Sequence, residues 1–274
     1  MIRLAANLST LFTELPFLDR FAAAACAGFS AVECQFPYEA APAAVAARLR
    51  EADLEWVLFN APPGASGERG IACLPGRERE FDAGIAQAAA YAVAGGVRRV
   101  HVMAGLLPAG ADRAAHLRRF VSSIARAADR LAEAGAAVMI EPINTRVDVP
   151  GYLLDGTQLA LECIAAAGRS NIRLQYDVYH MQIMEGDLMR SLERLLPSIG
   201  HVQIADNPGR HEPGTGEIAF ERVLPHLERL GYEGFVGCEY LPAADTVAGL
   251  GWARSWLARS DSRLEEMDRT LGRP

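Results

Sequence analysis

Four strand-like segments in the second half of the chain end in oxygen-bearing side chains. AAVMIE ends in Glu141, IRLQYD in Asp177 and FVGCE in Glu239, while Gln203 lies near the end of GHVQIADN. A carboxylate that closes an apolar strand costs roughly several kcal/mol if it is buried without a counter-charge. Carboxylates in one small volume also repel one another and raise each other's pKa values. A divalent cation relieves both costs, so these four side chains predict a metal site.

The types of these four ligands indicate which metal they would hold. Glu, Asp, Gln and Glu offer only oxygen atoms, which suits a hard divalent cation such as Mg²⁺, with Mn²⁺ as the alternative. The five cysteines are scattered and form no Cys-x-x-Cys pair, which argues against a zinc ribbon or a dithiol redox centre. One strand-terminal acid is more often a helix N-cap. Four polar ends on consecutive strands are harder to explain as caps.

Further polar residues lie close to these strand ends. His180 is either a core-edge histidine bonded to backbone or a substrate ligand. Arg210 lies in the glycine- and proline-rich segment 207–217, where its guanidinium would bind a substrate carboxylate through two hydrogen bonds. A solvated surface arginine is the alternative. In the first half of the chain Asn7, Glu33 and Asn60 also end strands, and both capping and function are open for them.

The elements that must position these residues alternate between short β-rich runs and Ala-, Leu-, Arg- and Glu-rich helical stretches. The predicted strands are residues 2–6, 31–36, 54–60, 98–104, 136–141, 172–177, 200–205 and 235–240. The predicted helices are residues 16–27, 42–52, 78–94, 112–134, 157–167, 187–196, 220–230 and 244–259. Such a repeat without hairpins predicts an α/β protein with a single closed (β/α)8 TIM barrel rather than an open doubly wound sheet.

The length of 274 residues fits one barrel, because α/β barrels often form a single domain of roughly 250 residues. We expect the catalytic barrel to span residues 1–260, followed by a polar tail, 261–274, that forms an extra helix or a frayed end. Gly28, Gly135, Gly168 and Gly231 are predicted to end helices in the left-handed conformation. The long loops after the third and seventh strands are predicted lids or substrate clamps.

Composition narrows the range of partners. The net charge of −7 argues against nucleic acid or an anionic membrane as the main partner, while a small anionic substrate stays open. No segment approaches the roughly 18 apolar residues of a membrane span, and the start of the chain does not read as a signal peptide. A cytoplasmic protein with reduced thiols is therefore expected, and a homo-oligomer is compatible with the sequence. The chain contains no lysine, which excludes Schiff-base chemistry on a lysine.

Six motifs spread over nearly the whole chain resemble the hydroxypyruvate isomerase family of xylose-isomerase-like TIM barrels. They are AANLS (5–9), GERGIACLPGRE (67–78), IEPIN (140–144), QYDVYHMQIMEG (175–186), HVQIADNPGRHEPGTGEI (201–218) and GCEY (237–240). The resemblance implies interconversion of hydroxypyruvate and 2-hydroxy-3-oxopropanoate (tartronate semialdehyde) through an enediol. It also implies a small anionic sugar-acid substrate and a divalent metal.

The resemblance also divides the site residues by role. It implies acid–base catalysis by Glu141 and Glu239, metal binding by both glutamates with Asp177 and Gln203, and substrate contacts from His180 and Arg210. Related ketose 3-epimerases usually have histidine where Gln203 stands, and a glutamate for which Asp148 is an imperfect counterpart. These departures weaken the epimerase alternative. The segment AANLSTLFTELPF (5–17) also resembles 2-oxo-tetronate isomerases, which are the main alternative.

Two alternatives come from other classes of protein. A nuclease of the endonuclease-IV type shares the barrel but needs a histidine-rich multi-zinc site and a basic face. The six histidines and the charge of −7 disfavour it. A non-catalytic sugar-acid sensor would keep binding residues but would not need both Glu141 and Glu239. The presence of both therefore favours an enzyme.

Overall fold

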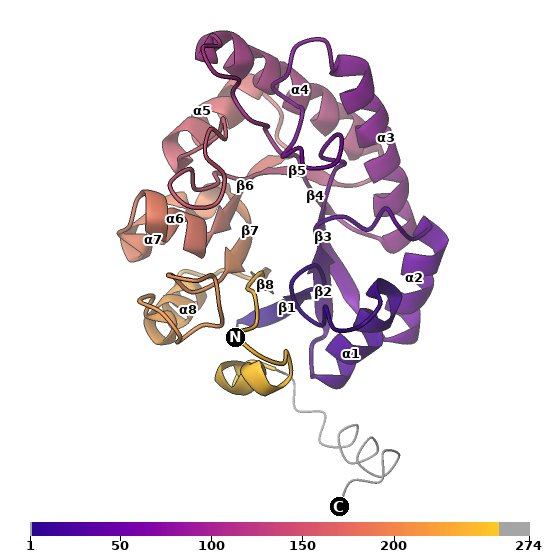
Figure 1. Cartoon of the computed structure of the whole chain (residues 1–274), viewed down its shortest axis with the longest axis vertical. Helices are drawn as coiled ribbons and strands as arrows, with labels where there is room; N and C mark the ends of the chain where they lie inside the picture. The colour runs from indigo at the N-terminus through magenta and orange to yellow at the C-terminus, as the bar shows by residue number, and fades with distance from the viewer. Residues whose placement is uncertain (1, 258–274) are drawn as a thin grey trace, which may run out of the picture.

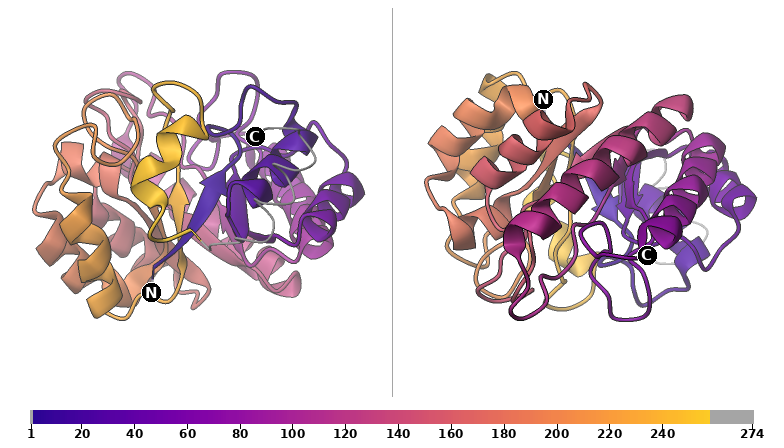
Figure 2. Two further views of the ribbon diagram at one scale, coloured as in Figure 1. Left: turned by 90° about the horizontal axis from the view of Figure 1, so that it is seen from below. Right: turned by 90° about the horizontal axis from the view of Figure 1, so that it is seen from above.

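A computed structural model describes residues 2–257 of the chain. Its eight parallel strands pair in sequence order and the last strand pairs with the first, which closes a barrel (Figure 1). Helices follow most strands and surround the barrel, as the side views also show (Figure 2). The prediction of a single (β/α)8 barrel is therefore confirmed.

The strands and helices alternate along the chain, and short 3-10 helices join or follow them. The strands are β1 (Arg3–Asn7), β2 (Ala31–Cys34), β3 (Glu55–Asn60), β4 (Arg99–His101), β5 (Ala137–Ile140), β6 (Ile172–Asp177), β7 (Ile199–Ile204) and β8 (Phe235–Cys238). The α-helices are α1 (Arg20–Cys26), α2 (Pro42–Glu51), α3 (Glu78–Gly95), α4 (Arg113–Glu133), α5 (Thr157–Ala167), α6 (Val178–Met184), α7 (Leu188–Leu195) and α8 (Phe220–Arg229). The 3-10 helices are η1 (Phe17–Asp19), η2 (Leu196–Ser198) and η3 (Ala248–Ala253).

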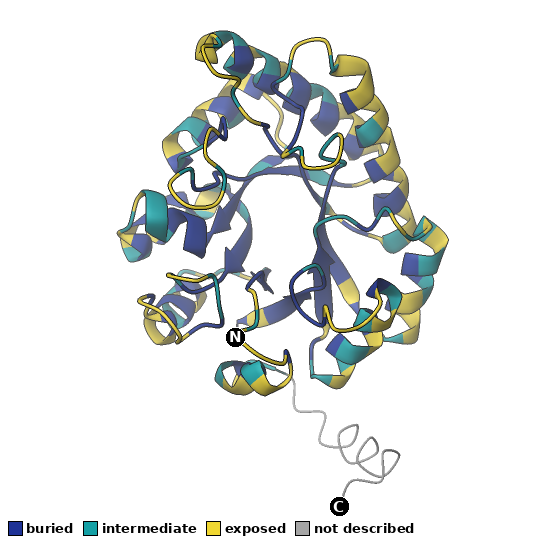
Figure 3. Ribbon diagram, in the orientation of Figure 1, coloured by how far each residue is buried: buried dark blue, intermediate teal, exposed yellow. Residues whose placement is uncertain are grey.

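The strands are buried on both faces, while the helices expose their outer faces (Figure 3). The main apolar core lies between helices and sheet. A second, smaller apolar cluster consists of strand residues only, namely Ala5, Ala31, Val57, Leu58, Met139 and Phe235. Because side chains alternate along a strand, residues two positions beyond a member of this cluster share its face. That alternation places Asn7, Glu33 and Glu141 in the next layer, towards the ends to which the strands point.

One predicted helix is wrong, and one observed helix was not predicted. The predicted helix 244–259 is wrong in its described part, which contains only the 3-10 helix η3. Gly249 and Gly251 lie in this segment, and each glycine costs an α-helix about 1 kcal/mol relative to alanine. Helix α6 was not predicted, because it has only 7 residues and follows β6 without a loop. The predicted tail, 261–274, lies outside the described residues.

Glycines end several helices as predicted. Gly28, Gly135, Gly168 and Gly231 all have positive φ angles, at 95°, 70°, 62° and 85°. The left-handed conformation is available to glycine without a Cβ penalty, so the chain turns sharply before the next strand. Within residues 2–257, no helix combines the length and apolar character that crossing a bilayer requires.

Candidate active site

Glu141 and Asp177 meet at the end of the barrel to which the strands point. Glu141 directly follows β5, and Asp177 is the last residue of β6. His180, in the first turn of α6, joins them, and one possible ligand atom from each residue lies within 4.8 Å of the others. All three side chains are buried. The sequence therefore predicted the meeting of the two carboxylates correctly, and the structure adds the imidazole to this cluster.

The two carboxylate oxygens of Asp177 have different surroundings. Its Oδ1 accepts a hydrogen bond from the backbone N–H of Tyr179 at 2.8 Å, which caps α6. Its Oδ2 has no hydrogen-bond partner within the described residues and is fully buried. The capping and metal-ligand interpretations of this strand end are thus compatible, because each uses a different oxygen.

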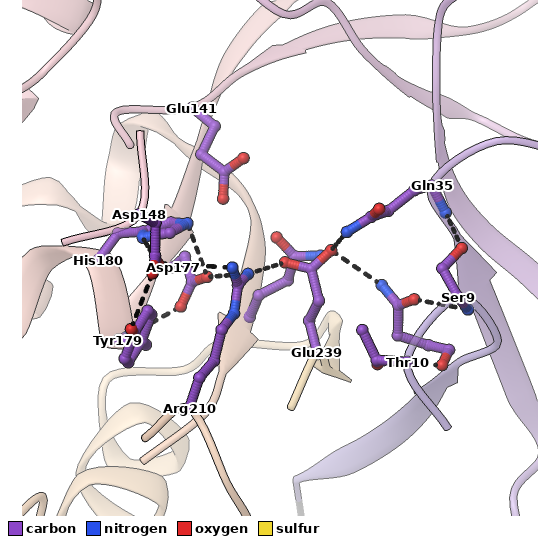
Figure 4. Close-up of polar contacts among 12 residues, drawn as sticks. Ser9, Thr10, Gln35, Glu141, Asp148, Asp177, Tyr179, His180, Arg210 and Glu239 are labelled. Atoms are coloured by element: carbon purple, nitrogen blue, oxygen red, sulfur yellow. Dashed lines mark hydrogen bonds and ion pairs between the residues drawn. The ribbon is translucent and has the colours of Figure 1, made fainter. Parts of the chain in front are cut away.

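Glu239 directly follows β8, and its carboxylate accepts hydrogen bonds from three side chains. Its Oε1 accepts hydrogen bonds from the side-chain amides of Asn7 at 3.1 Å and Gln35 at 3.0 Å. Its Oε2 accepts from the Arg210 guanidinium at 2.8 Å. Figure 4 shows this carboxylate between Gln35 and Arg210. Glu239 therefore lies in a fixed position, on the side of the site opposite to Asp177 across Arg210.

Arg210 lies between the carboxylates of the site (Figure 4). One of its terminal nitrogens, Nη2, is 2.8 Å from Glu239 Oε2 and 3.7 Å from Asp177 Oδ2, and Nη1 is 3.6 Å from Asp148 Oδ2. The guanidinium also lies over the ring of Tyr179, 5.2 Å from its centre. Only 21% of the side chain is exposed, so the alternative of a solvated surface arginine is excluded.

The backbone of the loop that carries Arg210 is held by one buried residue. Arg210 itself has a φ of 57°, a left-handed conformation that is uncommon outside glycine. Asp206 accepts hydrogen bonds from four backbone N–H groups of this loop, at 2.8–3.0 Å, namely those of Asn207, Gly214, Gly216 and Ile218. The loop is therefore an ordered clamp that presents the guanidinium to the carboxylates.

His180 is held by a side-chain network rather than by backbone. Asn144 Nδ2 lies 2.8 Å from His180 Nδ1 and 2.8 Å from Asp148 Oδ2. The Asn144 oxygen accepts from the backbone N–H groups of residues 147 and 148, so the amide nitrogen must be the group that faces the ring. Nδ1 of His180 therefore accepts, and a neutral ring carries its proton on Nε2. This nitrogen lies 3.6 Å from Asp177 Oδ2.

Gln203 occupies a layer just below these groups. Its Oε1 accepts from Gln175 Nε2 at 2.6 Å, and its Nε2 donates to Glu33 Oε1 at 2.7 Å. Glu33 also accepts from Asn7 at 3.0 Å and lies 2.6 Å from His201 Nε2. Glu33 is fully buried and caps no helix. Of the two roles that the sequence left open for it, capping is therefore excluded.

Burial and mutual repulsion set the protonation states of the site. Burial raises the pKa of Glu141 well above its usual value, and the charges of Glu239 and Asp177 raise it further. Burial likewise raises the pKa of Asp177 to about 7 and that of Glu239, although Arg210 opposes both shifts. For Arg210, burial alone would lower the pKa, but Glu239 and Asp177 raise it.

The two histidines near the carboxylates are neutral. Burial and the charge of Arg210 lower the pKa of His180 well below its usual value. Burial and, to a smaller extent, the neighbouring His201 lower the pKa of His101 to about 3. His101 faces inward from β4, with Nδ1 3.6 Å from Glu141 Oε2. Neutral rings can donate or accept a hydrogen bond without adding a positive charge to the site.

The donor set fits a divalent cation. Glu141 Oε1 and Asp177 Oδ2 are buried oxygens without a hydrogen-bond partner in residues 2–257. Such atoms are expensive unless a cation or a proton reaches them. His180 is close enough to be a third ligand, but its Nε2 carries a proton while Nδ1 accepts from Asn144. Carboxylate oxygens therefore form the core of the possible metal site.

A cavity of about 60 Å³ opens beside these groups. It is lined by Gln35, Phe36, Asn60, Arg69, His101, Met103, Glu141, Ile143, Val149, His180, Arg210 and Glu239. Its walls thus combine both glutamates, two histidines and two arginines with a few apolar side chains. Such a lining suits a small polar and anionic molecule.

Sequence reasoning gave too little weight to several residues of the first half of the chain. Asn7 and Glu33 were recognised as polar strand ends but not assigned to the site, and Gln35 was not considered. The period-two alternation that points Glu141 inward points Asn7 and Glu33 inward as well. The signal was therefore present in the sequence. Asn144, which fixes His180, has no comparable signal, because it follows the strand by several residues.

Comparisons with known proteins identify the family. The sequence profile described as xylose isomerase-like TIM barrel matches residues 21–256. The 2-oxo-tetronate isomerase of Cupriavidus necator is 50% identical over 261 residues, which cover 94% of this chain and 100% of that protein. The hydroxypyruvate isomerase of Escherichia coli is 46% identical over 254 residues, which cover 92% of this chain and 98% of that protein.

A solved structure agrees with these matches. The structure titled AP endonuclease, family 2, from Brucella melitensis has a TM-score of 0.91 and 45% sequence identity, and the match covers 94% of this chain and 100% of that chain. The chain therefore belongs to the xylose isomerase-like TIM barrel family. The predicted family resemblance and the predicted class of enzyme, an isomerase, are both confirmed by the relatives that match over nearly their whole length.

Proposed function

We propose that the protein interconverts hydroxypyruvate and 2-hydroxy-3-oxopropanoate by moving a proton between adjacent carbons. The observation that carries this proposal is the pair Glu141 and Glu239. Both are buried, both line one small cavity, and both have a raised pKa. A carboxyl group whose pKa is raised towards neutrality can take a proton in one step and return it in another.

The proton transfers follow from this pair. One glutamate removes a proton from C3 of hydroxypyruvate, which gives an enediol, and the other delivers a proton to C2. The hydroxyl proton on O3 is released and O2 is protonated, so that the carbonyl group moves from C2 to C3. The roles reverse in the back reaction. The Nε2–H of His180 supports this scheme as a neutral donor to a substrate oxygen.

A divalent cation, Mg²⁺ or Mn²⁺, is part of the proposal, with Glu141, Asp177, Gln203 and Glu239 as its ligands. The unpaired oxygens of Glu141 and Asp177 support it. Gln203 Oε1 already accepts from Gln175, so this ligand would use its second lone pair. When bound, such a cation stabilises the negative charge that develops on substrate oxygens. Arg210 would contact the substrate beside it.

The alternative substrate is a 2-oxo-tetronate, and the 50% identical relative from Cupriavidus necator supports it. The 46% identical hydroxypyruvate isomerase of Escherichia coli supports the three-carbon acid. Comparing kcat/KM for hydroxypyruvate with that for a 2-oxo-tetronate on the metal-loaded protein decides between them. We expect hydroxypyruvate to be preferred, and a clear preference for the four-carbon acid would replace the first proposal with the second.

Two substitutions test the acid–base pair. Glu141→Gln and Glu239→Gln keep the size of the side chain but remove the transferable proton, so each should lower kcat by about 10²- to 10⁴-fold. Glu55→Gln, at the exposed start of β3, is the matched control and should not change kcat. The reaction run in D2O should place solvent deuterium on carbon in the product. Full activity in both site variants would refute the assignment, and absence of deuterium would favour a hydride shift.

A cytoplasmic location completes the proposal. All five cysteines are free in the structure, and four of them are buried. Reduced, buried thiols are common in proteins of a reducing compartment.

A further inference from the structure

The cavity has two arginines, and only one of them is engaged. Arg210 contacts the carboxylates of Glu239, Asp177 and Asp148. Arg69 also lines the cavity, but it has no hydrogen bond or ion pair with any residue in the described part of the chain. Its side chain is exposed at the rim. The second guanidinium is therefore available to a ligand, while the first already serves as a counter-charge for the site.

The loop on which Arg69 lies is held rigidly on both sides of this residue. Glu68 accepts two hydrogen bonds from the Arg77 guanidinium, at 2.9 and 3.0 Å. Gly70 has a φ of 100° and packs so closely on the backbone of Met103 that a Cβ would collide with it. The Gly70 N–H also donates to the Pro63 carbonyl at 3.0 Å. The backbone at Arg69 is thus fixed over the cavity, although its side chain has no partner.

Electrostatics favour a free arginine at the rim for an anionic substrate. Glu141 and Glu239 line the cavity, Asp177 lies beside Glu141, and the chain as a whole carries a charge of −7. A substrate carboxylate is most stable at a distance from these three acids and next to a guanidinium that none of them engages. Arg210 lies among those acids, whereas Arg69 lies at the rim. A guanidinium at the rim can bind a carboxylate through two parallel hydrogen bonds.

We propose that Arg69 binds the carboxylate of the substrate, and that Arg210 instead balances the charge of the catalytic carboxylates. This inference rests on the proposed function, because it assumes an oxo-acid substrate. It assigns each arginine a separate task. Arg210 organises the site before the substrate arrives, and Arg69 orients the acid so that its C2 and C3 lie next to the two glutamates.

The test uses the full-length protein with Mg²⁺ and three variants. Arg69→Met should raise KM for hydroxypyruvate by about tenfold or more, with kcat changed much less, since a charge-assisted hydrogen bond to the substrate is lost in both ground and transition states. Arg69→Lys keeps the charge and should recover part of this loss. Arg79→Met removes an equally exposed charge on α3 that does not line the cavity, and it should leave KM unchanged.

A binding experiment separates this proposal from the proposed function. Glycerate carries the same carboxylate but has no carbonyl group, and its affinity can be measured by calorimetry without turnover. Arg69→Met should weaken glycerate binding by a factor similar to the rise in KM. Equal binding by the wild-type protein and Arg69→Met, or no binding by the wild-type protein, would overturn the role of Arg69. If the wild-type protein does not isomerise hydroxypyruvate, the proposed function fails, and the glycerate titration still decides the role of Arg69.

Discussion

The side-chain amide of Asn144 donates a hydrogen bond to Nδ1 of His180 over 2.8 Å. Because this amide is fully buried and its oxygen is held by two backbone N–H groups, it cannot rotate to offer the oxygen to the ring. The asparagine thereby decides which nitrogen of the neutral ring carries the proton. A residue outside the cavity lining thus controls the donor that faces the reacting groups.

Asn144→Asp should move the proton of the neutral His180 ring from Nε2 to Nδ1. A carboxylate accepts and does not donate, so it favours a proton on Nδ1 and stabilises the charged ring, which raises the pKa of His180. The result should be a fall in kcat/KM of about tenfold or more, as for other residues that orient a site group. NMR titration of the histidine ring protons measures the pKa directly. Asn171→Asp, far from the cavity, is the control, and an unchanged His180 titration in Asn144→Asp would contradict the argument.

Glu33→Gln should destabilise the protein although no substrate reaches this residue. The carboxylate accepts hydrogen bonds from Asn7 and Gln203 and lies 2.6 Å from His201 Nε2. A glutamine would place its own NH2 group among these donors, which leaves buried groups unpaired at a cost of about 1–3 kcal/mol. Urea unfolding measures the loss. The exposed Glu55→Gln should change stability by less than about 0.5 kcal/mol, and an equally small effect at Glu33 would refute this role.

The contrast between Glu33 and Glu141 shows what could be predicted from the sequence. Strand ends and barrel closure follow from local patterns, so the positions of Glu141, Asp177 and Glu239 could be predicted. The pairing of Glu33 with Gln203 joins residues 170 positions apart and depends on how two side chains cross the barrel. No local pattern encodes such a contact.

The predicted ligand set and helix α6 show the same limit. Gln203 was predicted as a metal ligand because it lies near the end of its strand. In the structure its oxygen accepts a hydrogen bond from Gln175, and metal binding by Gln203 stays a prediction. Helix α6 was missed because 7 residues are too few for a clear 3.6-residue period. For Asp177 the sequence set a helix cap against a metal ligand as alternatives, because it does not show that one carboxylate can offer one oxygen to each role.

Metal binding should depend on pH in a direction set by the buried carboxylates. In the folded protein the pKa of Asp177 is raised from 3.8 to about 7, and those of Glu141 and Glu239 are also raised. The folded state therefore holds protons more tightly than the unfolded state. Without metal, stability should fall as pH rises from about 4 to about 7. A divalent cation competes with these protons, so its stabilising effect should grow over the same interval.

Thermal unfolding with Mn²⁺ and with EDTA measures this effect. At pH 8, with free metal at about 100 times Kd, Tm should rise by about 5–10 °C, and at pH 5 by much less. Asp177→Asn should remove most of the metal-dependent shift, whereas the exposed Asp187→Asn should not. A shift that is equal at both pH values, or that survives Asp177→Asn, would contradict carboxylate ligation.

Asp206→Asn should release the loop that positions Arg210. The Asp206 carboxylate accepts two backbone N–H groups on each oxygen, and an asparagine has only one oxygen to accept them. The buried N–H groups left unpaired should open residues 207–217 and move Arg210 away from Glu239. Both a higher KM and a lower kcat are expected, because Glu239 then loses its counter-charge.

Limited trypsin digestion gives a direct readout of this loop. The bond after Arg210 should be protected in the wild-type protein, because the Arg210 guanidinium is held by Glu239 and its carbonyl accepts from the N–H of Leu241 at 2.7 Å. In Asp206→Asn the same bond should be cut several-fold faster. Asp245→Asn is the control, since the exposed Asp245 accepts one backbone N–H, that of Ala248. If Asp206→Asn is cut no faster than the control, the carboxylate does not hold the loop, and the position of Arg210 must depend on its own contacts, chiefly those with Glu239 and with the N–H of Leu241.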